Sequence, residues 1–90
     1  MARVAVVLKV LPSSVEIQPS QLLEKIKAAL PEEYKVEASG EEPIAFGLKA
    51  LKLVVSMPEE TEGGTSKLEE LIRQLPEVNE VEVERVHRMS

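Results

Sequence analysis

Residues 3–11 read Arg-Val-Ala-Val-Val-Leu-Lys-Val-Leu, a run in which valine and leucine predominate and only the first and seventh residues are charged. Side chains of this kind favour a strand, and a strand that is apolar on both faces is typical of the centre of a sheet. Pro12 ends the run. A second run of the same character covers residues 48–57 and ends before Pro58. The sequence therefore predicts two central strands.

Two segments carry the apolar spacing of amphipathic helices. The first is predicted from Pro19, which suits an opening helical turn, to about residue 30, before Pro31. The second is predicted to start at Ser66, because Ser66 and Glu69 have the spacing of a capping box. The apolar residues expected to face the core are Leu22, Leu23, Ile26, Ala29 and Leu30 in the first helix and Leu68, Leu71, Ile72 and Leu75 in the second.

Two more polar segments are predicted to be edge strands. One covers residues 34–39, and the other begins near residue 80, where Val81 and Val83 alternate with glutamates. Leu22 and Ile26 recur 46 positions later as Leu68 and Ile72, which suggests two similar β-α units. The order β-α-β-β-α-β predicts a single domain, residues 1–90, with an α+β, ferredoxin-like two-layer sandwich and a four-stranded antiparallel sheet.

Composition restricts the classes of function. The 90 residues carry a net charge of −5, which argues against binding to a nucleic-acid backbone, and the predicted central strands offer no aromatic side chain for stacking bases. No apolar run approaches the ~20 residues that span a bilayer, and no signal peptide is visible. We therefore expect a cytoplasmic protein that contacts neither membrane nor nucleic acid directly.

Catalytic and metal-binding patterns are also missing. The chain has no cysteine and one histidine, His87, so neither a thiolate site nor a histidine cluster can form. Residues 63–66 read Gly-Gly-Thr-Ser, which we interpret as a helix-start turn, since the lysine of a phosphate-binding loop is missing. An acylphosphatase-like activity would need a placed arginine and asparagine, and Arg3 and Asn79 do not fit that pattern. We expect no cofactor, no metal and no catalytic residues.

Two clusters remain as candidate functional residues. Phe46, the only phenylalanine, lies between Pro43 and Gly47 in a segment, residues 40–46, that is predicted to be a loop. Its ring either packs beneath that loop or is presented to a partner. Arg85, His87 and Arg88 form a basic cluster near the C-terminus, which is either a solvated tail or a second contact region.

Residues 43–53, Pro-Ile-Ala-Phe-Gly-Leu-Lys-Ala-Leu-Lys-Leu, resemble the loop and strand of the exchange domain of translation elongation factor 1-beta. The segment 64–70, Gly-Thr-Ser-Lys-Leu-Glu-Glu, is similar to the start of that family's second helix. Length and element order match the compact archaeal form, so the resemblance covers essentially the whole chain.

The resemblance implies a guanine-nucleotide exchange factor, not an enzyme, whose partner is the GTPase elongation factor 1-alpha in its GDP-bound and nucleotide-free states. It implies that Phe46, with Ile44, Gly47 and Lys49 beside it, inserts into an apolar pocket of that GTPase. Arg88, with His87 as an alternative, lies near the position of a C-terminal lysine that reaches towards the magnesium site. Here that residue is an arginine, and Ser90 extends one residue beyond the usual ending. A regulatory domain of the same fold, which dimerises through an edge strand and binds a small molecule, is the alternative.

Overall fold

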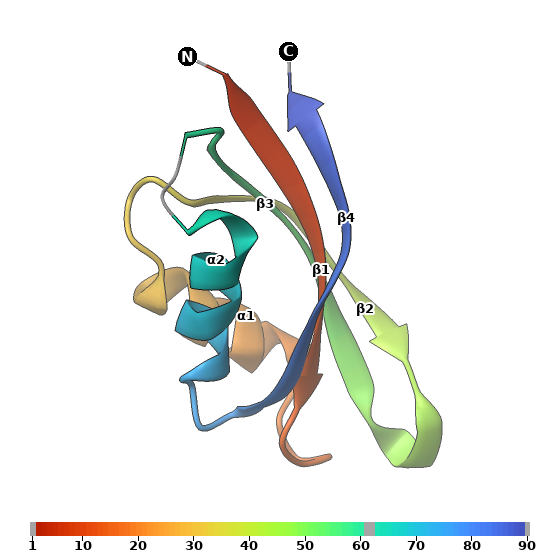
Figure 1. The fold of residues 1–90 in the computed structure, drawn as a ribbon. Helices are drawn as coiled ribbons and strands as arrows, with labels where there is room; N and C mark the ends of the chain where they lie inside the picture. The colour runs from red at the N-terminus through yellow and green to blue at the C-terminus, as the bar shows by residue number, and fades with distance from the viewer. Residues whose placement is uncertain (1, 61–62, 90) are drawn as a thin grey trace.

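The computed structural model describes residues 2–60 and 63–89, and its elements follow the predicted order. They are β1 (Arg3–Pro12), α1 (Pro19–Ala29), β2 (Lys35–Pro43), the short 3-10 turn η1 (Ala45–Gly47), β3 (Lys49–Pro58), α2 (Gly64–Arg73) and β4 (Val78–Met89). The strands form one antiparallel sheet in the order β2-β3-β1-β4, and both helices lie on one of its faces (Figure 1). The predicted ferredoxin-like sandwich is confirmed, with β1 and β3 central and β2 and β4 at the edges.

The core lies between the helices and one face of the sheet. Leu8 of β1 pairs with Leu53 of β3, and their relative exposures are 0% and 1%. The other buried hydrophobic residues of this core are Val6, Val10, Leu22, Ile26, Tyr34, Leu51, Val55, Met57, Leu68, Ile72, Val78 and Val81. Because full burial of one aliphatic side chain contributes about 1.5–3 kcal/mol, this aliphatic layer supplies most of the drive to fold.

Neither helix of the described residues covers the opposite face of the sheet. Ala5, Val7 and Lys9 of β1 alternate with the core residues, and all three are half-buried rather than buried. The prediction that this strand is central is confirmed, but only one of its two apolar faces lies against the helices. We call the face that points away from the helices the open face. Side chains from neighbouring strands cover it in part, since Ala5, Val7 and Lys9 are half-buried.

The hairpin between β2 and β3 is longer than predicted. Residues 40–43 were expected to be a loop, yet Gly40 pairs with Lys52 and Pro43 pairs with Lys49. The segment contains two glutamates, which have low strand propensity, so its local sequence does not indicate a strand. Pairing with the strongly apolar β3 extends β2 to Pro43, which is acceptable at the end of an edge strand.

The second helix begins two residues earlier than predicted. Its N-cap is Gly63, at φ 84°, a residue that has no side chain with which to cap the helix, so the expected capping box of Ser66 and Glu69 is wrong. Two glycines with positive φ turn the chain directly into the helix, which places Ser66 inside the first turn. Helix α1 instead has the reciprocal contact that a capping box provides, because the Gln18 backbone N–H donates to Gln21 Oε1 at 2.8 Å.

Candidate partner-binding site

The tip of the β2–β3 hairpin, residues 44–48, is a tightly closed loop. The Ile44 N–H donates to the Leu48 carbonyl at 2.9 Å, and the Leu48 N–H donates to the Ala45 carbonyl at 3.2 Å. Between them Phe46 and Gly47 both adopt positive φ, 60° and 78°. Glycine suits this region, and a side chain added at Gly47 would meet no atom within 4 Å, so backbone conformation rather than space requires the glycine.

Phe46 points out into solvent. Its relative exposure is 94%, so the interpretation that the ring packs beneath its own loop is wrong. Its left-handed conformation is unfavourable for a bulky residue, by about 1–2 kcal/mol. A large ring that is exposed, on a residue with a strained backbone, does not stabilise the domain at this position. Such strain persists where the surrounding structure imposes it, and it occurs often at functional sites.

The residues predicted to accompany Phe46 lie around it. Ile44 is half-buried at the start of the loop, and Lys49 is exposed at its end, where its Nζ lies 3.8 Å from Glu41 Oε1. The structure therefore brings Ile44, Phe46, Gly47 and Lys49 together at one end of the molecule.

Val15 is a residue at this end that the sequence analysis missed. It lies in the loop between β1 and α1, it is 55% exposed, and it lines a hollow of about 50 Å³ together with Gly47 and Lys49. The available signal was a single apolar residue inside the polar stretch Ser-Ser-Val-Glu at residues 13–16. Isolated exposed apolar residues are common, so that signal alone has little weight.

The basic cluster at the C-terminus is not a solvated tail. Arg85, His87 and Arg88 belong to β4 and pair with Val7, Ala5 and Val4 of β1. Nη2 of Arg88 lies 2.9 Å and 3.0 Å from the two carboxylate oxygens of Glu59, which follows β3. The strand thus fixes the backbone positions of these three residues, whose side chains are exposed, while Ser90 lies outside the described residues.

The two candidate clusters lie at opposite ends of the sheet. Arg88 pairs with Val4, and Val4 pairs with Met57, eight positions along β3 from Lys49. At ~3.3 Å per residue this corresponds to about 26 Å. Figure 1 shows the start of β1 and the end of β4 at one end of the sheet and the hairpin tip at the other. Phe46 and the basic cluster therefore cannot enter one pocket, and a single partner would have to contact them at separate places.

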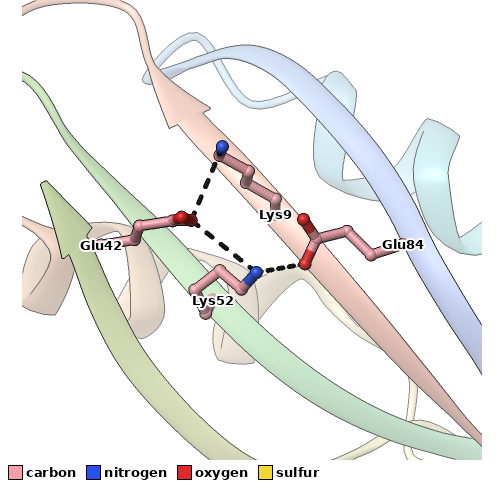
Figure 2. Close-up of polar contacts among 4 residues, drawn as sticks. All are labelled: Lys9, Glu42, Lys52 and Glu84. Carbon is pink, nitrogen blue, oxygen red and sulfur yellow. Dashed lines mark hydrogen bonds and ion pairs between the residues drawn. The ribbon is translucent and has the colours of Figure 1, made fainter. Parts of the chain in front are cut away.

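A charge network crosses the open face and consists of Lys9, Glu42, Lys52 and Glu84, one residue from each strand (Figure 2). Glu42 Oε2 is shielded from solvent and lies 3.5 Å from Lys9 Nζ and 3.7 Å from Lys52 Nζ. Lys52 also donates a hydrogen bond to Glu84. That bond, together with the charges of Glu84 and Glu42, raises the pKa of Lys52, although partial desolvation acts in the opposite direction.

The open face offers a limited space for small molecules. A hollow of about 210 Å³ lies above Val7, Ala38 and Val54, smaller than the ~300–1,000 Å³ of typical ligand pockets. In residues 2–60 and 63–89 no group of three or more histidine, aspartate or glutamate side chains could hold a metal ion. Neither of the helices described is long and apolar enough to cross a membrane.

Comparison with known proteins identifies the family. The family model of the EF-1 guanine nucleotide exchange domain matches residues 5–89. The chain belongs to this exchange-domain family. A protein named Elongation factor 1-beta from Aeropyrum pernix is 62% identical over 90 residues, which cover 100% of both chains. Proteins of the same name from Hyperthermus butylicus and Staphylothermus marinus are 58% and 54% identical over 100% of this chain and 98% and 100% of theirs. The resemblance read from residues 43–53 and 64–70 is thus confirmed.

Proposed function

We propose that residues 1–90 act as one exchange domain that promotes GDP release and GTP reloading on the elongation factor 1-alpha GTPase during translation elongation. Membership of the exchange-domain family supports this role. The structural observation that carries it is Phe46, a 94% exposed ring on a strained, hydrogen-bonded loop. The factor works in the cytoplasm, without a cofactor and without direct contact to nucleic acid or membrane.

The mechanism is a change in binding equilibria, and no covalent bond forms or breaks. Bound GDP is retained mainly by phosphate contacts and by Mg²⁺, which neutralises phosphate charge. Insertion of Phe46 into an apolar pocket would add binding energy only in a loosened form of the GTPase, so that form becomes more populated. By linkage, factor and nucleotide weaken each other's binding by the same factor, and abundant GTP then fills the empty site.

The other residues have supporting roles in this proposal. Gly47 allows the turn that presents Phe46, while Ile44 and Lys49 border the ring and contact the rim of the pocket. At the opposite end Arg88, with His87 as the alternative, would approach the magnesium site, where the positive charge of the arginine would repel the metal ion. Because about 26 Å separates the two ends along the sheet, the GTPase would be contacted at two places.

The experiment is release of a fluorescent GDP analogue from the purified GTPase, measured over a range of factor concentrations. Phe46→Ala should slow the stimulated release at least tenfold, because a buried aromatic anchor contributes ~2 kcal/mol or more to an interface. Phe46→Leu should retain part of the activity, since it keeps most of the apolar area. Gln74→Ala, an exposed change at the end of α2, is the control. Release by Phe46→Ala at the wild-type rate would remove the proposed role of the ring.

A further inference from the structure

The end of the hairpin that carries Phe46 extends beyond the rest of the sheet. Pairing between β1 and β3 ends at Val10 and Leu51, whereas pairing between β2 and β3 continues to Pro43 and Lys49. Residues 42–50 therefore form an arm of only two strands with the tip loop at its end, at the lower right in Figure 1. A two-stranded ribbon twists more than a sheet and is marginally stable alone. Backbone pairing within the arm does not by itself fix its direction.

The charge network joins this arm to the sheet. Glu42 belongs to the arm, and its shielded Oε2 lies within 3.5 Å of Lys9 on β1 and 3.7 Å of Lys52 on β3 (Figure 2). No backbone bond of the sheet joins β2 to β1, because β3 lies between them. The contact between Glu42 and Lys9 therefore spans a strand and links the arm directly to the centre of the sheet.

The Glu42 carboxylate reduces the electrostatic repulsion between Lys9 and Lys52. Lys9 and Lys52 are direct cross-strand partners, an arrangement in which like charges repel. Glu42 lies against both ammonium groups, and Glu84 on the far edge strand accepts a hydrogen bond from Lys52. The side chains are only 23–42% exposed, so solvent screens these charges less than it screens a fully exposed pair. Removal of Glu42 would take away the ion pair of Lys9 and one of the two ion pairs of Lys52 at the base of the arm, and the repulsion between the two lysines would increase.

We propose that the charge network sets the direction of the arm and thereby the position of Phe46, with Glu42 as the positioning residue. The inference rests on the proposed exchange function. Glu42 touches neither nucleotide nor the apolar pocket in this role and acts only through the ring. A pocket that accepts a single ring binds it best when the ring is already in place before contact. Such preorganisation reduces the conformational entropy that is lost on binding.

The test is a double-mutant cycle in the GDP-release assay with the full chain, comparing wild type, Glu42→Gln, Phe46→Ala and the double variant. Glu42→Gln should raise the factor concentration needed for half-maximal release about threefold to tenfold and leave the maximal rate unchanged. In the Phe46→Ala background the same change should have no further effect. Glu69→Gln, which removes the 3.8 Å pair with Arg73 on α2, is the matched control and should behave as wild type.

The outcomes separate this inference from the function on which it rests. If Phe46→Ala slows release but Glu42→Gln does not, or if the two effects simply add, the positioning role is refuted while the exchange role stands. If Phe46→Ala releases GDP as wild type does, both are refuted. Thermal unfolding of each variant shows whether it is folded under the assay conditions. Glu42→Asp, which retains the charge, is a second variant, and its factor concentration for half-maximal release should lie between those of wild type and Glu42→Gln.

Discussion

We expect Phe46 to lower the free energy of unfolding of the domain although it is needed for GDP release. The substitution Phe46→Asn tests this expectation. Asparagine adopts positive φ far more readily than phenylalanine, so the substitution should recover most of the ~1–2 kcal/mol of backbone strain at φ 60°. Little burial is lost in exchange, because the ring is 94% exposed. The covered part is roughly 12 Å², or about 0.3 kcal/mol.

The net expectation is a gain of about 1 kcal/mol in the free energy of unfolding, which corresponds to a rise in Tm of about 4–8 °C for a domain of this size. The same variant should lose stimulated GDP release as completely as Phe46→Ala does. Phe46→Ala is the control for stability, because alanine has no comparable preference for positive φ and should leave Tm almost unchanged.

Urea unfolding and thermal unfolding, each followed by circular dichroism, measure the stability, and the GDP-release assay measures the function. A fall in the Tm of Phe46→Asn would show that the ring makes stabilising contacts and would refute the strain argument. Stability and exchange that both increase would refute the claim that the ring acts on the partner.

Three further outcomes are expected. Ile72→Ala, at a fully buried position of α2, should lower the free energy of unfolding by about 2–5 kcal/mol in urea denaturation, and a loss below 1 kcal/mol would show that the helix does not close the core. Gly47→Ala should destabilise the tip by about 1 kcal/mol and weaken exchange, because φ there is 78°; unchanged release would mean that the turn tolerates the strain. Burial raises the pKa of Tyr34, with a smaller contribution from Glu33, so folding favours the neutral phenol. The corresponding stability is complete below the ordinary tyrosine pKa of about 10 and is lost as pH rises through the higher folded-state pKa; Tyr34→Phe should show a smaller loss over that range, and an identical pH profile would contradict the assignment.

Much of the fold could be predicted because its signals are local. The valine-rich run at residues 3–11 and its counterpart at 48–57 indicate central strands in any context, and the helix periodicities place Leu22 and Leu68 in the core correctly. Errors occurred where local preference and tertiary pairing disagree. Residues 40–43 look like a loop until β3 pairs with them, and Ser66 looks like a cap until two glycines turn the chain earlier.

In the candidate site, too, some features could be predicted from the local sequence and others depend on tertiary pairing. A lone phenylalanine beside a glycine identifies the segment, yet periodicity does not indicate whether the ring faces inward or outward. The orientation depends on the hairpin closure between Ile44 and Leu48 and on the positive φ of Phe46. Likewise a basic cluster at the C-terminus is visible in the sequence, but its incorporation into β4 and its distance from Phe46 follow only from pairing with β1.

The order of strands and helices, the two central strands and most of the core can be inferred from the amino-acid sequence, because periodicity and side-chain polarity are patterns among residues near one another in the chain. The folded structure was needed to establish the length of the arm, the exposure of Phe46 and the charge network that joins the four strands. These features depend on strand register and turn conformation, which join residues far apart in the sequence, such as Lys9 and Glu42, 33 positions apart, and Lys52 and Glu84, 32 positions apart. Short-range patterns carry no information about such pairings.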